Sequence, residues 1–240
     1  MTTLIKLPAL GIEVPVRPMK VKEFDLLTNQ VKMASGDALE ELLIACIEGD
    51  QKPDVTKMLS ADRNALLIGI RRATFGNMYE FSVKSPFDSE GKTQTFEVDL
   101  SLLELKEGNR ELVKKRLENP DATFPYEMAD GTKILWRFTD GTDVKKALKA
   151  MKSDTKATQD LLLRIVKVEG LEDKGIPLKR WLGDLNYADM QDFNDYYEEN
   201  SPGVDETIEL VCQRTGEPFT VKLEISTENF FKRSSRKKTS

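Results

Sequence analysis

The fold is decided by the stretch YEFSVKSPFDSEGKTQTFEVDL, residues 79–100, together with its counterpart TIELVCQRTGEPFTVKL, residues 207–223. Each contains a strand of alternating apolar and polar residues, a four-residue knuckle, a turn with glycine and a second alternating strand. Both stretches therefore predict a β-hairpin of the same design. We expect the two hairpins to pack face to face, with these apolar residues available for the contact: Val83, Phe96, Val211 and Phe219.

This layout is typical of a zinc ribbon, in which each knuckle carries Cys-x-x-Cys and four thiolates bind one zinc ion. The equivalent positions here hold Ser85, Asp88, Cys212 and Thr215. Only Cys212 can supply a thiolate, and hydroxyl groups are poor zinc ligands. We therefore expect the four residues to cluster at one end of a small antiparallel β unit, with no metal ion and no other cofactor bound.

The composition excludes the common catalytic arrangements. The chain has 240 residues and no histidine, which removes Ser-His-Asp and Cys-His catalysis in their usual forms. No G-x-x-x-x-G-K-[ST] or G-x-G-x-x-G phosphate loop is present. Pairs of neighbouring carboxylates are weak evidence for catalysis, because a chain with 41 acidic residues contains such pairs by chance. We predict a protein that is not an enzyme and has no small-molecule substrate.

Charge and hydropathy limit the classes of partner that the protein can have. The net charge of −5 opposes general binding to nucleic acid. The longest apolar runs, such as residues 65–70, are too short to span a bilayer, and the first residues lack the apolar core of a signal peptide. Two cysteines, Cys46 and Cys212, cannot form a disulfide framework. These features predict a cytoplasmic protein without a membrane or nucleic-acid partner.

The last residues are a local exception to the acidic charge. Residues 232–240 (KRSSRKKTS), which we call the basic tail, begin with Lys232 and Arg233 and contain no acidic residue. Such an end is typical of a flexible, solvated tail that aids solubility. The alternative is an arm that contacts phosphate groups, a neighbouring subunit or an acidic surface.

Residues 20–75 carry apolar residues at helical spacing and predict a helical region. Its last helix is expected to run from Ala61 to about Thr74, with Ser60 as the N-cap. Arg71 lies in the last turn of this helix, where a positive charge complements the helix dipole.

Residues 124–199 predict a middle hairpin followed by helices. The hairpin is expected to turn at Asp130-Gly131, a dipeptide typical of tight turns. Helical spacing predicts a helix capped by Thr142, another over about 156–168, and a last one capped by Asn186.

The two ribbon halves, residues 78–100 and 206–224, must meet if they complete one ribbon. Separable domains are then disfavoured, and the sequence predicts one unit over residues 1–231. We expect the α+β class, with helical segments around a composite, zinc-ribbon-like antiparallel β unit that lacks most metal ligands.

Three passages resemble the T-even phage baseplate hub assembly (central spike) proteins of contractile tails. Residues 14–23 resemble that family's opening segment, residues 71–81 its helix-to-ribbon junction, and residues 208–231 its closing ribbon, strand and paired phenylalanines. Members often carry Cys-Pro-x-Cys at both knuckles. Here the first knuckle keeps only the proline and the second keeps one cysteine and the glycine. This departure concerns metal binding rather than the fold.

The resemblance implies a structural or assembly protein of a phage tail baseplate hub, which acts by contacts with other tail and baseplate proteins. It also implies synthesis in the host cytoplasm and a place in the virion tail baseplate. Large aromatic residues dominate interface energies. The candidate contacts are therefore Phe87, Trp181, Phe230 and Phe231, with Lys232 and Arg233 of the basic tail; the alternative for each aromatic is a place in the core.

Two other functions remain open from the residues. A degenerate zinc-ribbon adaptor that contacts nucleic acid or transcription machinery has the ribbon and the basic tail in its favour, and the acidic net charge against it. An enzyme that uses carboxylates without histidine is the other alternative, and the sequence indicates no pocket for it.

Overall fold

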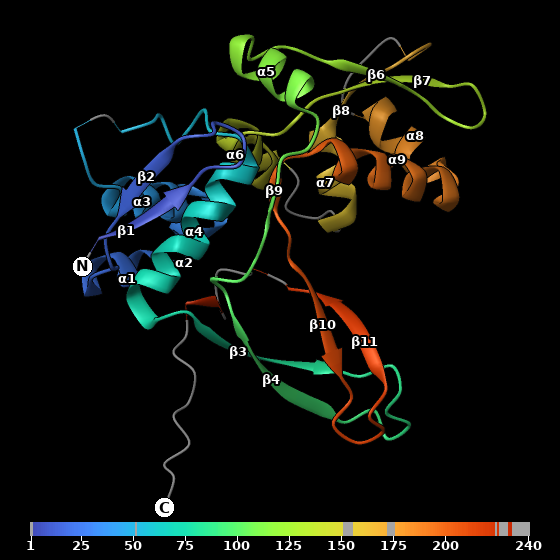
Figure 1. The fold of residues 1–240 in the computed structure, drawn as a ribbon. Helices are drawn as coiled ribbons and strands as arrows, with labels where there is room; N and C mark the ends of the chain where they lie inside the picture. Colours follow the sequence, from blue (N-terminus) through green and yellow to red (C-terminus); the bar gives the residue numbers. More distant parts are fainter. Residues whose placement is uncertain are drawn as a thin grey trace, which may run out of the picture.

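The structure, a computed structural model, describes residues 2–50, 52–150, 156–171, 176–223, 225 and 230–231. It is a mixed α/β fold in which helices accompany small antiparallel sheets, and two hairpins extend away from the helical body (Figure 1). Among the described residues, no helix combines the length and the apolar character needed to cross a membrane.

The first part of the chain combines a hairpin and three short helices with the long helix α4 (Ser60–Phe75). Strands β1 (Thr3–Lys6) and β2 (Glu13–Val16) form the antiparallel hairpin. The short helices are α1 (Val21–Thr28), α2 (Gln30–Ser35) and α3 (Asp37–Cys46). Strand β1 lies directly on α4, because Gly69 has no side chain and a Cβ there would overlap Ile5.

These elements enclose the first hydrophobic core, which also takes in residues from the hairpins and from the C-terminal end. Burial of each Leu, Ile, Val or Phe side chain in such a core contributes about 1.5–3 kcal/mol. The largest contributors from the first part are Leu7, Val16, Leu42, Leu43, Ile47, Leu66 and Ile70, and those from later in the chain are Tyr79, Leu100, Leu223, Phe230 and Phe231. Residues from both ends of the chain therefore share one core.

The first turn of α4 holds the turn between β1 and β2. Asp62 is completely buried, and its carboxylate oxygens accept hydrogen bonds from the backbone N–H groups of Ala9 (2.7 Å) and Leu10 (3.2 Å). Burial raises the pKa of Asp62 to about 6, because the charged carboxylate loses its hydration.

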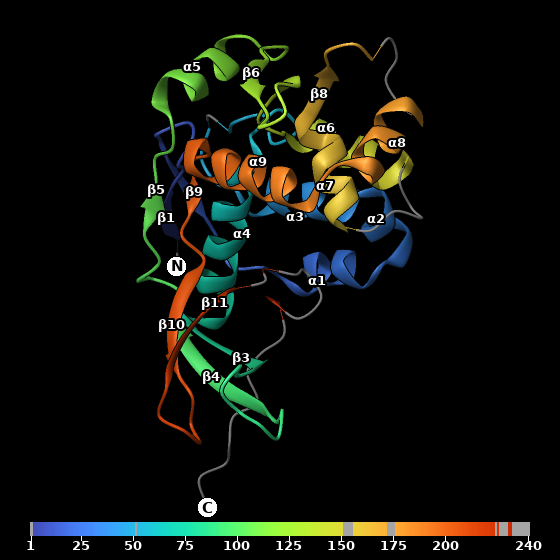
Figure 2. The same cartoon turned by 90° about the vertical axis from the view of Figure 1, so that its right-hand side faces the viewer.

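The middle of the chain forms a second body around a sheet with the order β6-β7-β8 (Figure 2). Its strands are β6 (Phe124–Glu127), β7 (Lys133–Trp136) and β8 (Ile165–Val168). Its helices are α5 (Arg110–Glu118), α6 (Gly141–Ala150), α7 (Lys156–Arg164), α8 (Ile176–Asp184) and α9 (Tyr187–Asn200). The second hydrophobic core includes Phe124, Ile134, Trp136, Phe138, Ile165, Val168, Phe193 and Tyr197.

The helix expected over about 156–168 is wrong in its last four residues. Helix α7 ends at Arg164, and the chain continues as β8, in which Ile165 pairs with Trp136 and Val168 pairs with Ile134. Both Ile165 and Val168 are buried against β7. Their β-branched side chains fit a strand better than a helix, so tertiary pairing decides the conformation.

Two of the expected helix caps are also wrong. Helix α4 has Leu59 as its N-cap, and the hydroxyl of Ser60 lies 2.9 Å from that of Thr139 instead. Helix α6 begins at Gly141, and Thr142 donates from its hydroxyl to the carbonyl oxygen of Thr56 (3.3 Å). The expected cap of α9 is confirmed, because the Asn186 side chain accepts from the N–H of Ala188 (3.1 Å).

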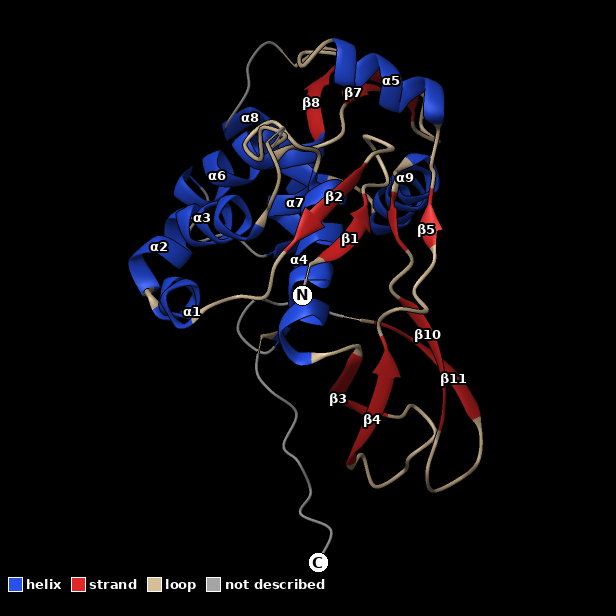
Figure 3. Cartoon of the chain, turned by 60° about the vertical axis from the view of Figure 1, so that its left-hand side comes forward, coloured by secondary structure: helices blue, strands red, loops and turns tan. Residues whose placement is uncertain are grey.

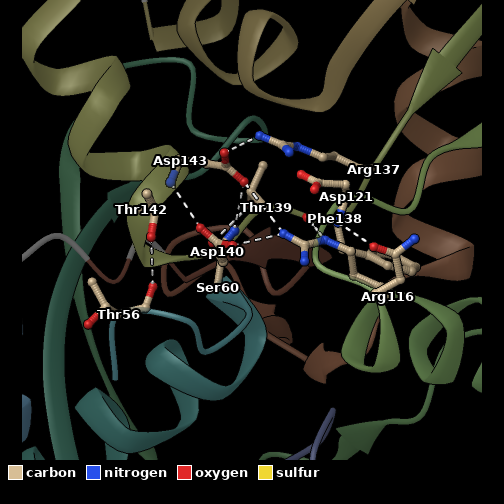
Figure 4. A network of polar contacts seen from close by, with 11 residues as sticks. Thr56, Ser60, Arg116, Asp121, Arg137, Phe138, Thr139, Asp140, Thr142 and Asp143 are labelled. Atoms are coloured by element: carbon tan, nitrogen blue, oxygen red, sulfur yellow. Dashed lines mark hydrogen bonds and ion pairs between the residues drawn. The ribbon is translucent and has the colours of Figure 1, made fainter. Parts of the chain in front are cut away.

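Asp140 caps α6 in a reciprocal arrangement (Figure 4). Its carboxylate accepts from the N–H of Asp143 (3.0 Å), and the Asp143 carboxylate accepts from the N–H of Asp140 (3.3 Å). Arg116 of α5, itself buried, donates to Asp140 (2.8 Å) and to the carbonyl oxygen of Phe138 (3.1 Å), while Arg137 pairs with Asp143. This network joins α5 and the end of β7 to the start of α6.

The hairpin β3 (Met78–Lys84)–β4 (Thr93–Asp99) follows α4, and the hairpin β10 (Thr207–Val211)–β11 (Pro218–Lys222) follows α9. They lie side by side and project from the body in all views (Figures 1 and 3). Just above them, β5 (Leu105–Lys106) pairs antiparallel with β9 (Gly203–Val204). The segment that leads from the first hairpin into the body therefore lies beside the segment that leads from the body to the second hairpin. We call the two hairpins together the arm.

Candidate functional site at the hairpin tip

The two knuckles meet at the free end of the arm (Figure 3). Asp88 of the first knuckle forms an ion pair with Arg214 of the second, with 2.8 Å between Oδ1 and Nε. The same guanidinium donates to the hydroxyl of Ser89 (3.1 Å). One arginine of the second hairpin therefore holds the turn of the first.

A buried glutamine joins both knuckles from the side of β4. The Gln94 side-chain amide donates to Asp88 (3.3 Å) and to the sulfur of Cys212 (3.4 Å), and its oxygen accepts from the N–H of Gln213 (2.8 Å). The side chain of Gln213 in turn donates to the carbonyl oxygen of Thr95 (2.8 Å). These contacts link strands that belong to two separate hairpins.

Cys212 is buried at the centre of this cluster, with 1% of its surface exposed. Hydrogen bonds from Ser85, Thr215 and Gln94 to the sulfur favour the thiolate and lower the pKa of Cys212 to about 6. The structure thus brings together all four knuckle residues that the sequence singled out: Ser85, Asp88, Cys212 and Thr215.

Asp88 is the second charged group of the cluster. Burial raises the pKa of Asp88, but hydrogen bonds from the N–H of Glu90 and from Gln94 and Arg214 outweigh this effect and hold it below its usual value. The carboxylate is therefore charged and already paired with a cation.

An apolar layer lies behind the polar tip. Phe96 packs edge-on against Phe219 with ring centroids 6.0 Å apart, which joins one hairpin to the other. The buried members of the layer are Leu210, Cys212 and Phe219, and Phe81, Val83, Phe96, Ile208 and Val221 pack against them.

The expectation that Val211 belongs to this layer is wrong. Val211 is 56% exposed, because the side chains of a strand alternate between its faces and Leu210 and Cys212 occupy the inner one.

The residues at the tip do not fit a zinc site. Among the described residues, no group of three or more His, Cys, Asp or Glu side chains is placed to hold a metal ion. The tip offers one thiol, two hydroxyls and a carboxylate whose oxygens face Arg214 and Gln94. A guanidinium group beside the carboxylate would repel a second cation.

The candidate contact residues have different surroundings. Phe87 lies on the first knuckle and is 46% exposed. Trp181 is half-buried and packs against the second core. Phe230 and Phe231 are 0% and 2% exposed and pack inside the first core, which is the place in the core that the sequence analysis kept open for each aromatic residue, and not an exposed anchor. Lys232 and Arg233 lie outside the described residues.

Two further residues make contacts that the sequence analysis did not predict. Gln94 lies on the same face of β4 as the apolar residues Phe96 and Val98, because side chains alternate along a strand. A polar residue on this inward face was the sequence feature that could have identified Gln94. Arg71 was interpreted as a helix-dipole charge, whereas it is completely buried and donates to the carbonyl oxygens of Phe230 (3.1 Å) and Gly76 (3.0 Å).

No curated protein and no solved structure has a significant match to the chain. The sequence profile of the family described as T4 bacteriophage base plate protein matches residues 1–232. The match includes both hairpins and the segment that ends at Phe231. A match of this length gives the chain a structural role in a phage baseplate, where it contacts other tail or baseplate proteins of the virion. The chain belongs to the family of T4 bacteriophage base plate proteins.

Proposed function

We propose that this protein is a structural component of the baseplate hub of a contractile phage tail and acts through protein–protein contacts during hub assembly. It is made in the host cytoplasm and then joins the tail, and it has no enzymatic activity. Membership of the T4-type baseplate family supports this role. So does the absence of histidine from the whole chain.

The structural feature that supports this proposal is the arm. It extends away from the helical body, and its tip is rigidified by the Asp88–Arg214 ion pair and by the bridge from Gln94. Phe87 is exposed on this rigid tip. An aromatic side chain on a preorganised surface is typical of an interface anchor, because little conformational entropy is lost on binding.

We interpret the arm as a ribbon of the zinc-ribbon type that has lost its metal ligands. Each hairpin presents a knuckle to the other at the place where such a ribbon holds its ion. Hydrogen bonds around Cys212, the Asp88–Arg214 pair and the Phe96–Phe219 contact then take over the stabilising role of the metal.

We further propose that residues 1–231 act as one unit; the basic tail, residues 232–240, lies outside the described residues. The first core contains residues of the N-terminal region, of β3 and of the C-terminal segment. The β5–β9 pairing connects the arm to the second body. An adaptor that contacts nucleic acid has less support, since the net charge is −5. We propose no membrane or small-molecule partner.

The test replaces Phe87 by alanine in a phage that lacks its own copy of the gene and is complemented with the variant. We expect wild-type protein level and melting temperature, and roughly a tenfold or larger loss of incorporation into baseplates, as for removal of an interface anchor. The matched control is Leu102→Ala, which removes another exposed apolar side chain (77% exposed) outside the tip. Normal incorporation of the Phe87→Ala protein would refute a contact role for the tip.

A further inference from the structure

A cavity of about 370 Å³ lies where helix α4, the second body and the base of the arm meet. The strand β9, which leads from α9 to the arm, forms one of its walls (Figure 2). Closely packed protein interiors contain few voids larger than a water molecule. The cavity therefore marks a junction at which the parts of the molecule are not packed tightly together.

The walls of the cavity do not favour a ligand of either charge. Their charged residues are Lys106, Arg164 and Lys222 on the positive side and Glu198, Asp205 and Glu206 on the negative side. Ser201, also in the wall, has a buried hydroxyl that lacks a hydrogen-bond partner within the described part of the chain. A permanently closed junction would normally satisfy such a group.

Glu198, near the end of α9, is the carboxylate that the three cations approach. Its Oε2 lies 3.5 Å from Nζ of Lys222 on β11 and 3.8 Å from Nζ of Lys106 on β5. Its Oε1 lies 3.8 Å from Nη2 of Arg164. Tight charge-assisted hydrogen bonds are about 2.7–2.9 Å long, so all three pairs are loose. The side chain of Lys222 is 60% exposed, so dissolved salt reaches and screens its ion pair.

Two of these pairs connect different parts of the molecule. Arg164 stays with the second body, because its guanidinium lies over the ring of Tyr197 on α9, 4.1 Å from the centroid. Lys222, in contrast, belongs to the arm, and Lys106 belongs to the strand that leads from the arm into the second body. We call Glu198, Lys106 and Lys222 the Glu198 cluster. It joins the second body to the base of the arm across the cavity.

The arm itself is fixed to the elements of the first core. Tyr79 on β3, Leu100 after β4 and Leu223 after β11 are all buried in that core. The guanidinium of Arg71, at the end of α4, lies 4.8 Å from the centroid of the Tyr79 ring. The arm and the elements of the first core therefore move as one piece.

The second body is held more firmly where α6 begins. Backbone hydrogen bonds of 2.9, 3.1 and 3.2 Å join residues 56–60 to residues 139–142. Helix α6 continues this contact, because Lys145 forms an ion pair with Asp37 of α3 (2.6 Å). Leu59 lines the cavity and is buried in the second core. The cavity thus has close backbone bonds at this end and the loose Glu198 cluster elsewhere in its wall.

We propose that the second body turns relative to the first core and the arm, with residues 56–60 and 139–142 as the hinge, and that the Glu198 cluster holds the closed position. When salt screens the cluster, or when Glu198 loses its charge, the cavity opens and the arm points in a different direction from the second body. The hinge bonds persist, so the protein remains one unit. This conformational change goes beyond the contact role proposed for Phe87 and does not depend on it.

The experiment measures distances in the full-length protein by double electron–electron resonance between spin labels on pairs of introduced cysteines. The first pair, Thr93→Cys with Ala129→Cys, joins the arm to the second body at two exposed positions. The second pair, Thr93→Cys with Val31→Cys, joins the arm to the helices of the first core. The native Cys46 and Cys212 are buried, so they remain unlabelled.

We expect the first pair to give one narrow distance distribution at low salt. At about 1 M salt, where the Debye length falls to about 3 Å, the distribution should broaden and its mean should shift. The Glu198→Gln variant should show the high-salt distribution already at low salt. Its matched control is Glu199→Gln, the next residue of α9, which is exposed and has no ion pair within the described part of the chain. The second pair of labels should give the same distance throughout.

A second variant approaches the same contact from the arm. Lys222→Gln should shift the first pair in the same way as Glu198→Gln, and its melting temperature should stay near that of the wild type, because the Lys222 side chain is largely exposed.

Three results would overturn the proposal. The first is an unchanged distribution in folded Glu198→Gln and Lys222→Gln proteins, and the second is an equal shift in Glu199→Gln. The third is a salt-dependent change in the second pair as large as that in the first, because the arm would then move on its own. A failed Phe87→Ala test would leave this proposal standing, since the distances are measured on the isolated protein.

Discussion

The side chain of Arg71 and the backbone of Phe230 are in direct contact although 159 positions separate them in the sequence: Nε of Arg71 donates to the carbonyl oxygen of Phe230 at 3.1 Å. The guanidinium also lies over the rings of Tyr79 (4.8 Å to the centroid) and Phe230 (5.7 Å). Arg71 is completely buried, so this contact fixes the C-terminal segment to the end of α4.

Replacement of Arg71 by alanine is expected to lower the free energy of unfolding by about 2–4 kcal/mol, because the carbonyl oxygens of Phe230 and Gly76 lose their buried donor. Urea denaturation measures the change. Arg72→Ala is the matched control: Arg72 makes an exposed hydrogen bond to Asn77 (3.2 Å), and its loss should cost below about 0.5 kcal/mol. Equal effects of the two variants would show that the buried contact does not hold the segment.

The paired phenylalanines should matter for stability rather than for surface contact. Each of Phe230→Ala and Phe231→Ala is expected to cost about 3–5 kcal/mol, because both rings are buried in the first core. Soluble, fully stable protein from the variant with both Phe230→Ala and Phe231→Ala would contradict the packing of these two residues.

Deletion of 232–240 should leave the melting temperature unchanged and reduce assembly into particles.

Thiols placed at the knuckles should convert the tip into a metal site. The wild-type melting temperature is expected to be unaffected by a chelator, whereas the variant with Ser85→Cys, Asp88→Cys and Thr215→Cys should bind one equivalent of zinc and melt higher when zinc is present. Elemental analysis and thermal unfolding check both. Stoichiometric zinc in the wild type would refute the absence of a metal, and no zinc in the folded variant would refute the ribbon interpretation of the knuckles.

Asp62 should make stability fall as pH rises. Its folded-state pKa of about 6 exceeds the ordinary 3.8, so its contribution is fully present below the ordinary value and is lost as pH rises through about 6. Over this window the wild type should lose up to roughly 3 kcal/mol relative to Asp62→Asn, measured by denaturation at a series of pH values. Asp54→Asn is the control of opposite sign: hydrogen bonds from Thr56 lower the pKa of Asp54, so its contribution is lost as pH falls.

The local pattern of the sequence was enough to predict the hairpins and the cap at Asn186, because each depends on residue spacing within a short segment. The meeting of the knuckles was predicted from the shared design of the two hairpins. The local pattern was not enough for Val211, whose face depends on strand register, or for β8, whose short apolar run fits either a helix or a strand until β7 is present to pair with it. The contacts of Gln94 with Cys212 and of Arg71 with Phe230 join residues more than one hundred positions apart, so the spacing of neighbouring residues carries no information about them.

The place of Phe230 and Phe231 in the first core has a consequence for synthesis. A chain emerging from the ribosome makes its N-terminal elements first, yet the core around α4 lacks two large side chains until residues 230 and 231 are translated. Completion of this core therefore waits for the translation of Phe230 and Phe231. A chain terminated before them would present an open apolar surface to chaperones and proteases, so copies that include this segment are favoured for entry into a growing phage tail.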